Sequence, residues 1–251
     1  MVDHVNRPLP RDALGDGGGG LPRRAAAVVP TTSQAESRTA QPREPLDRAR
    51  LAGAQVLATV LAETSAGGEV HAESLFCALG ALGGYACQAS LRAQALACGL
   101  HPDEPFAVTR LGSGRRLFGG EALDELLVGD RLSIWGLAAG GAHHAGAREF
   151  PNLPAIFARA AAEAGSPLFG VPRYPGRAAQ ELPIDYLKRL WPALLPPVER
   201  HAGDPVLWPT AFGFAIKAGI ESPLPALAPD EALLIVMQAA VPMSRVDLSL
   251  H

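Results

Sequence analysis

A long run without any charged side chain, from Ser74 to Leu91, lies between Glu73 and Arg92. Placed on a helix, the run carries leucines on one side and glycines and cysteines on the other, so both sides are apolar. A helix that is apolar nearly all round belongs in the interior of a protein, with partners on each face. The sequence therefore predicts a mainly α fold, a multi-helix globular domain built around this central, apolar helix rich in glycine and alanine.

Glycines spaced four residues apart occur in two segments. Gly80 and Gly84 lie one turn apart in the central helix, and Gly136 and Gly140 repeat the spacing in a later apolar segment. Such glycines leave no side chains between two helices and let their backbones approach closely. We expect the later helix, or the central helix of a second subunit, to pack against Gly80 and Gly84. All four glycines are predicted packing or interface positions, and whether they lie in the core or between subunits stays open.

The uncharged run has a second interpretation as a membrane span, because glycines at this spacing are also typical of transmembrane helices that dimerise. A span needs about 20 strongly apolar residues. The run falls slightly short of this length and includes the polar residues Ser74, Gln88 and Ser90. We therefore expect a buried helix of a soluble protein and no membrane partner.

Composition and charge argue against several classes of partner. A chain of 251 residues with 48% hydrophobic residues can bury a sizeable core. Its net charge of -3 provides no general attraction for nucleic acid, so no nucleic-acid partner is expected. The three cysteines are too few for a disulfide framework, which favours a reducing compartment and a cytoplasmic location. Heavy use of alanine, glycine, proline and arginine suggests a bacterial source.

The chain divides into an N-terminal extension and one helical domain. Residues 1–44 are rich in glycine and proline and contain no aromatic side chain, so they bury too little apolar surface to offset the entropy of ordering and are predicted to be disordered. Whether this extension is a genuine part of the protein stays open. Residues 45–251 are predicted to form a single helical domain with one β-hairpin at about 106–119, where two alternating segments flank the turn residues GSG.

Prolines punctuate the helices expected in the last third of the chain. Pro183, Pro205 and Pro229 suit positions in the first turn of a helix. Pro192 and Pro209 lie deeper, and because proline cannot donate the backbone hydrogen bond of a helix interior, we expect them to kink or restart their helices.

The sequence contains no motif for a metal ion, a cofactor or a catalytic nucleophile. His143 and His144 are adjacent, so on a helix they point in directions too different to share one metal ion. The three cysteines, Cys77, Cys87 and Cys98, fall on one expected helix, where we interpret them as small hydrophobic residues. No metal site and no cofactor are predicted.

Two short constellations are weak candidates for chemistry. His71 and Glu73 open the central helix, where they serve either as capping residues or as a base and its partner at the mouth of a pocket. Asp185 and Arg189 lie four residues apart, the usual spacing of an ion pair along a helix, and are the second candidate.

A loop from Leu168 to Tyr186, rich in proline and glycine, combines aromatic residues with Arg173 and Arg177. Long loops in small domains often act as lids or contact surfaces. A pocket beneath this loop could bind a small anion through either arginine, whereas the plainer interpretation is a surface loop held by its prolines.

These observations support two functional hypotheses. The first is a helical binding protein that forms homo-oligomers or serves as a partner subunit, with close contacts through its glycine faces. The second is an enzyme without a metal or nucleotide motif, acting on a small anionic molecule in a pocket among His71, Glu73, Arg173, Asp185 and Arg189. A membrane-associated helical protein is a weaker third possibility.

Overall fold

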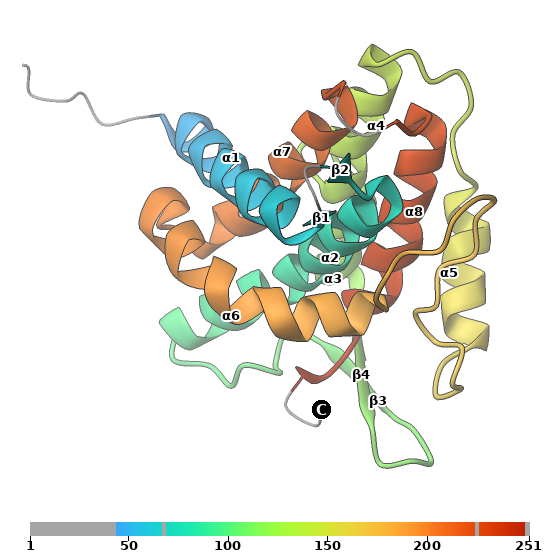
Figure 1. Ribbon diagram of the computed structural model, residues 1–251. Helices are drawn as coiled ribbons and strands as arrows, with labels where there is room; N and C mark the ends of the chain where they lie inside the picture. The colour runs from blue at the N-terminus through green and yellow to red at the C-terminus, as the bar shows by residue number, and fades with distance from the viewer. Residues whose placement is uncertain (1–43, 67–68, 224–225, 249–251) are drawn as a thin grey trace, which may run out of the picture. The chain divides into compact units, whose positions relative to one another are not determined.

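The computed structural model describes residues 44–66, 69–223 and 226–248. The predicted extension, apart from Glu44, lies outside these residues. The fold is mainly α with small two-stranded sheets, which confirms the predicted class (Figure 1). The helices are α1 (Pro45–Glu63), α2 (Ala72–Ala97), α3 (Glu121–Asp124), α4 (Ile134–His144), α5 (Leu153–Ala162), α6 (Pro183–Ala202), α7 (Trp208–Glu221) and α8 (Pro229–Met243). Shorter helical turns are η1 (Glu125–Gly129) and η2 (Pro205–Leu207).

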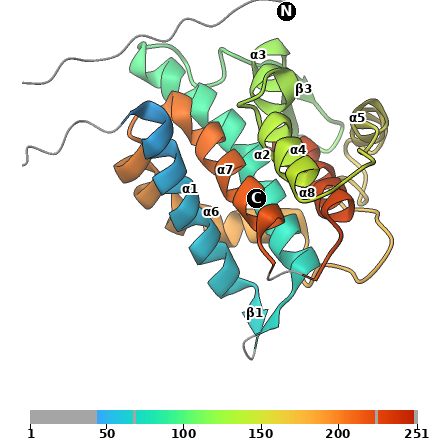
Figure 2. The same cartoon turned by 90° about the horizontal axis from the view of Figure 1, so that it is seen from above.

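Helix α2 is the predicted central helix. Figures 1 and 2 show it in the middle of the helices, and its residues from Ala72 to Gly84 are all buried. The helix begins where the side chain of His71 accepts a hydrogen bond from the backbone N–H of Ser74 at 3.3 Å. Helices α6, α7 and α8 pack directly against it, while α1 and α4 lie against α7. Because α2 is apolar on all sides, neighbouring helices pack against several of its faces.

The glycine face of α2 lies against α8, and not against α4 or a second subunit. A Cβ atom added at Gly80 would lie 2.9 Å from Cα of Val236, and one at Gly84 would lie 2.8 Å from Cα of Ala240. Val236 and Ala240 are themselves one turn apart, so the two helix backbones touch along a full turn. The expected close approach exists, but the predicted partner was wrong.

Gly136 and Gly140 do not form a second helix-packing motif. Gly136 lies against the turn that precedes its own helix, where an added Cβ would be 2.7 Å from Cα of Arg131. Gly140 faces open space. Other glycines of the same region make the close contacts instead: Gly141 of α4 lies on Lys217 of α7, and Gly53 of α1 lies on Ala215 of α7.

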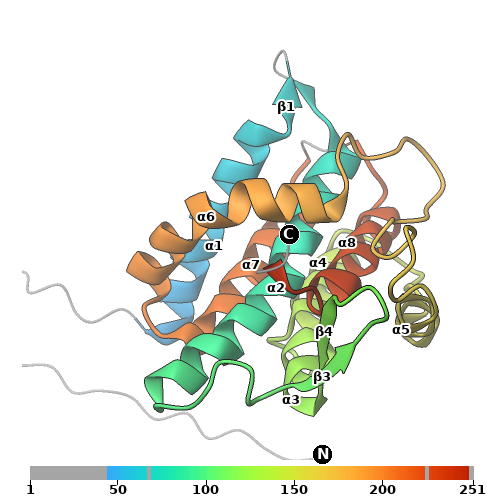
Figure 3. The same cartoon turned by 90° about the horizontal axis from the view of Figure 1, so that it is seen from below.

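The prolines act largely as expected. Pro209 falls in the first turn of α7, directly after η2, so the chain restarts a helix there. Helix α6 continues past Pro192 and also contains Pro196 and Pro197, and its ribbon bends along its length (Figures 1 and 3). A bend is the normal response of a helix to an internal proline, because the ring clashes with the preceding turn.

The predicted hairpin is formed by β3 (Ala107–Arg110) and β4 (Arg116–Gly119), with Val108 opposite Phe118. The other side of β4 is bridged by the C-terminal segment, where Leu117 pairs with Val246. A shorter hairpin, β1 (Ser65–Ala66) and β2 (Glu69–Val70), joins α1 to α2 and was not predicted. Its brevity leaves too little alternation in the sequence to indicate a strand.

Candidate functional site

A cavity of about 250 Å³ lies beneath the loop that joins α5 to α6. Its walls come from four places: the loop segment 166–171, the start of α6, the end of α8 with Val246 that follows it, and Arg115 of the hairpin turn. About half of the lining surface is apolar, and its apolar side chains include Phe169, Val171, Ile184, Met243 and Val246. The prediction of a pocket under this loop therefore has a counterpart in the structure.

The loop is held in place by local turns and by one buried amide. Phe169 N–H donates to the Ser166 carbonyl oxygen at 3.2 Å, and the following turn closes in the same way from Val171 to Leu168. Gly170 has a φ of 80° and lies against Met243 of α8, a combination that favours glycine. Further along, Oε1 of Gln238, buried on α8, accepts a hydrogen bond from the backbone N–H of Arg173. The roof of the cavity is thus tied to α8.

Two cations line this cavity, Arg115 from the turn of the β3–β4 hairpin and Lys188 from α6. Both side chains are exposed, and neither forms an ion pair with a carboxylate in the described part of the chain. Ser166 adds a hydroxyl group to the same lining. The arrangement is a small cavity with apolar side chains and two cations in its lining, which suits a ligand that carries negative charge on an apolar body.

A second cavity, of about 270 Å³, brings together three of the candidate residues. His71, Glu73 and Arg177 all line it, with Gln180 and Glu69. Nδ1 of His71 lies 3.6 Å from Oε2 of Glu73 and also accepts the capping hydrogen bond from Ser74. The structure therefore shows the capping role and places the pair beside a cavity, as the two interpretations of the sequence proposed.

The other candidates lie elsewhere, and the two arginines among them are engaged by carboxylates. Arg173 pairs with Glu163 at 2.8 Å. Arg189 pairs with Glu63 at 2.6 Å and with Glu181 at 2.8 Å, and not with the exposed Asp185 at the helical spacing. The predicted pocket among all five residues is therefore wrong, and so is the Asp185–Arg189 pair. Charged side chains select their partners from distant parts of the chain, which sequence spacing does not reveal.

Two hydroxyl groups near the start of α2 accept hydrogen bonds from the loop that precedes α6. Tyr174 Oη accepts a hydrogen bond from Ala179 N–H at 2.9 Å, and Ser74 Oγ accepts one from Gln180 N–H at 2.9 Å.

Two of the three cysteines are buried. Burial raises the pKa of the Cys77 thiol to about 12, so this thiol stays protonated and is a poor nucleophile. Burial also raises the pKa of Cys87, whereas Cys98 is exposed. The interpretation as small hydrophobic residues fits the two buried cysteines and not Cys98.

Alkaline pH should test this packing, because burial raises the pKa of all three tyrosines, Tyr85, Tyr174 and Tyr186, that of Tyr174 to about 12. Above pH 10.0, the ordinary tyrosine pKa, the unfolded chain loses tyrosine protons that the folded chain keeps, so the free energy of unfolding falls as pH rises from 10 towards 12. In a titration followed by tyrosinate absorbance and circular dichroism, ionisation should accompany loss of the helix signal. Full tyrosine ionisation near pH 10 with the helices intact would contradict the burial.

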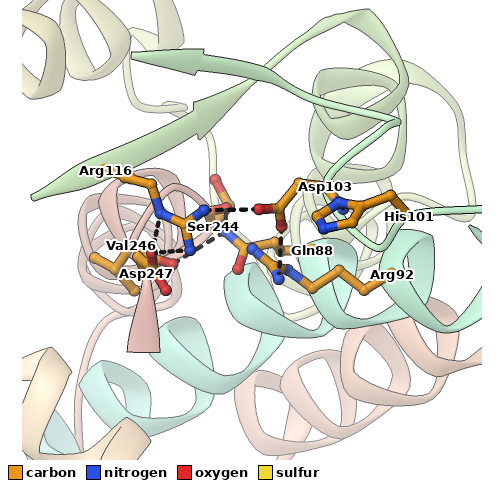
Figure 4. A network of polar contacts seen from close by, with 8 residues as sticks. All are labelled: Gln88, Arg92, His101, Asp103, Arg116, Ser244, Val246 and Asp247. Atoms are coloured by element: carbon orange, nitrogen blue, oxygen red, sulfur yellow. Dashed lines mark hydrogen bonds and ion pairs between the residues drawn. The ribbon is translucent and has the colours of Figure 1, made fainter. Parts of the chain in front are cut away.

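A chain of alternating charges forms a separate polar network (Figure 4). Asp103 pairs with Arg92 of α2 and with Arg116 of β4, both at 2.8 Å, and Arg116 also pairs with Asp247 at 2.7 Å. Nε2 of Gln88 donates to the carbonyl oxygens of Ser244 at 2.9 Å and Val246 at 3.1 Å. These groups join α2, the hairpin and the C-terminal segment, and we interpret them as structural. Sequence reasoning missed them because the partners lie far apart along the chain.

Two further properties bear on function. Within the described ranges, no group of three or more histidine, cysteine, aspartate or glutamate side chains is placed to hold a metal ion. Of the helices described, α2 alone is long and apolar enough to cross a membrane, and most of it is buried among other helices, which is consistent with the core helix of a soluble protein.

Comparison with known proteins gives no indication of function, because no family model, no curated protein and no solved structure matches the chain.

Proposed function

We propose that this chain is a soluble, cytoplasmic helical protein that binds a small anionic molecule in the cavity beneath the loop from α5 to α6. The observation that carries the proposal is the pair of cations without carboxylate partners among the described residues, Arg115 and Lys188, on one partly apolar cavity. An anionic group at its margin would supply the negative charge that neither cation receives from a carboxylate of the described residues. The apolar walls would hold the rest of the ligand.

The size and chemistry of the cavity favour this function over a contact for a large partner. A volume of about 250 Å³ lies near the lower end of cavities that enclose small molecules. An arginine offers several donors in a fixed plane and a lysine offers a mobile point charge, a combination suited to carboxylate or phosphate oxygens. Because both cations are exposed, their attraction should weaken as ionic strength rises.

The test is a calorimetric titration of the full chain with hexanoate and with inorganic phosphate. We expect one of these anions to bind, and the variants Arg115→Gln and Lys188→Gln each to weaken its binding by about 10-fold or more, since each removes a charge-assisted contact. Arg200→Gln is the matched control, because Arg200 is an exposed cation of α6 that does not line the cavity. Equal losses in all three variants, or no binding of either anion, would contradict the proposal.

The cavity beside His71, Glu73 and Arg177 supports a second candidate, an enzyme that acts on a small anionic molecule by proton transfer. The supporting observation is the 3.6 Å separation of His71 Nδ1 and Glu73 Oε2 on a cavity that also has an arginine. Its weakness is that Nδ1 already accepts the capping hydrogen bond. An enzymatic activity lost in both His71→Gln and Arg177→Gln, and kept in Lys188→Gln, would favour this candidate over the first.

Self-association through Gly80 and Gly84 has no exposed surface to use, because α8 covers both glycines within one chain. A homo-oligomer or a partner subunit would have to use other helix faces. We therefore place ligand binding ahead of assembly in the proposed function.

A further inference from the structure

The cavity proposed to bind the anion, beneath the loop from α5 to α6, is called the anion cavity below. It has a larger apolar neighbour. A groove of about 570 Å³ lies between helix α5 and the face of the β3–β4 hairpin that carries Thr109 and Leu117. Figure 3 shows this hairpin and α5 on the same side of the helices, with the loop from α5 to α6 nearby. The groove has more than twice the volume of the anion cavity, so the two differ in capacity as well as in chemistry.

Shared side chains connect the groove to the anion cavity. Phe169 lines both of them and also lines a small hollow between the loop and the hairpin. That hollow shares Arg115 and Val246 with the anion cavity, and it shares Leu117 with the groove. The three hollows therefore adjoin one another at the Phe169 ring. The middle one is small, about 20 Å³, and is also lined by Arg116 and Asp247, which pair with each other.

The groove is apolar and is kept open by short side chains. Alanines of α5, among them the exposed Ala158 and Ala161, form one wall. Arg245 is the only charged residue in its lining among the residues that the structure describes. Its guanidinium group already pairs with Asp124 at 2.6 Å and lies over the Phe157 ring at 5.4 Å. An apolar chain would meet no uncompensated charge there.

We infer that the ligand is a free anionic amphiphile, a carboxylate on a long unbranched alkyl chain. Its head group lies between Arg115 and Lys188, and its tail passes Phe169 into the groove beside α5. This inference rests on the proposed function and deepens it, because it states why a small anion cavity adjoins an apolar groove. The charge of the two cations selects an anion, and the apolar lining of the groove selects an alkyl tail over a compact polar body.

The affinity should therefore increase with the length of the tail. Each methylene group that leaves water for the groove contributes a roughly constant free energy, equivalent to about a fourfold gain in affinity. The gain should continue from hexanoate through octanoate and decanoate to dodecanoate, and should stop when the groove is full.

The experiment titrates the full chain with these four carboxylates below their micelle concentrations, using variants that fill the groove. Ala158→Trp and Ala161→Trp should remove most of the gain from hexanoate to dodecanoate and leave the affinity for hexanoate unchanged. Both positions are exposed, so the larger ring should be tolerated. Ala162→Trp is the matched control, since Ala162 is an exposed alanine of α5 that does not line the groove.

The outcomes separate this inference from the proposed function. If hexanoate binds but affinity does not rise with chain length, or if Ala161→Trp and Ala162→Trp behave alike, the tail site is wrong and the anion site stands. If neither hexanoate nor phosphate binds, the anion site itself is wrong. Vesicles of phosphatidylglycerol form a further arm: recruitment of the chain to vesicles without binding of free dodecanoate would overturn the inference of a free ligand.

Discussion

Replacing Gly84 with alanine is expected to lower the free energy of unfolding by about 3 kcal/mol or more, at the upper end of the range for overpacked cores. The added Cβ would overlap the carbonyl oxygen of Ala240 and lie 2.8 Å from its Cα. These atoms belong to the backbone of α8, which cannot rotate away as the tip of a side chain can. Urea unfolding of the full chain, followed by circular dichroism, measures the loss.

Gly140→Ala is the matched control, because Gly140 belongs to the other pair of glycines with the same spacing and faces open space in α4. Alanine has a higher helix propensity than glycine, so this variant should gain up to about 1 kcal/mol. Equal stability changes in the two variants would contradict the placement of Gly84 in the core. So would a Gly84→Ala protein that keeps its stability and changes only from an oligomer to a monomer in light scattering.

The central helix and the hairpin could be predicted because their signals are local. A run that is apolar on every side of a helix has only one favourable place in a folded chain, and α2 occupies it. The alternation on either side of the turn GSG similarly indicated β3 and β4. Both predictions required only the periodicity of a single segment.

The partner of the glycine face could not be predicted in the same way. The spacing of Gly80 and Gly84 shows that another backbone can approach, but it carries no information about which helix does so. Helix α8 lies far along the chain, and its contact residues Val236 and Ala240 are not themselves glycines. The choice of α8 over α4 depends on how the whole core packs.

The candidate site was predicted in part. The loop from Leu168 to Tyr186 does cover a cavity, but the cations on that cavity come from the hairpin turn and from α6. Of the two arginines expected there, Arg173 is held by Glu163 and Arg177 lines the second cavity. The role of a cation depends on which carboxylates lie nearby in space, and this was beyond the reach of the sequence.

Replacing Asp103 with asparagine is expected to cost about 3 kcal/mol of stability, the size of effect seen when one member of a buried charge pair is removed. The Asp103 side chain is only 14% exposed and pairs with both Arg92 and Arg116. Arg116 keeps Asp247, but Arg92 would lose the one carboxylate that pairs with it among the described residues. Its Nε and Nη2 atoms are already buried without hydrogen-bond partners in that part of the chain.

Asp47→Asn provides the comparison for Asp103→Asn, since Asp47 pairs with Arg50 at 3.1 Å while its side chain is 57% exposed. An exposed pair gains little in water, so this variant should change stability by about 0.5 kcal/mol or less. The contact of the Arg92 guanidinium group with the Phe118 ring, 4.4 Å from its centroid, remains in the Asp103 variant and stabilises that cation. If urea unfolding gives the two variants the same small loss, the ring contact is enough to stabilise Arg92, and the ion pair with Asp103 adds little to the stability of the fold.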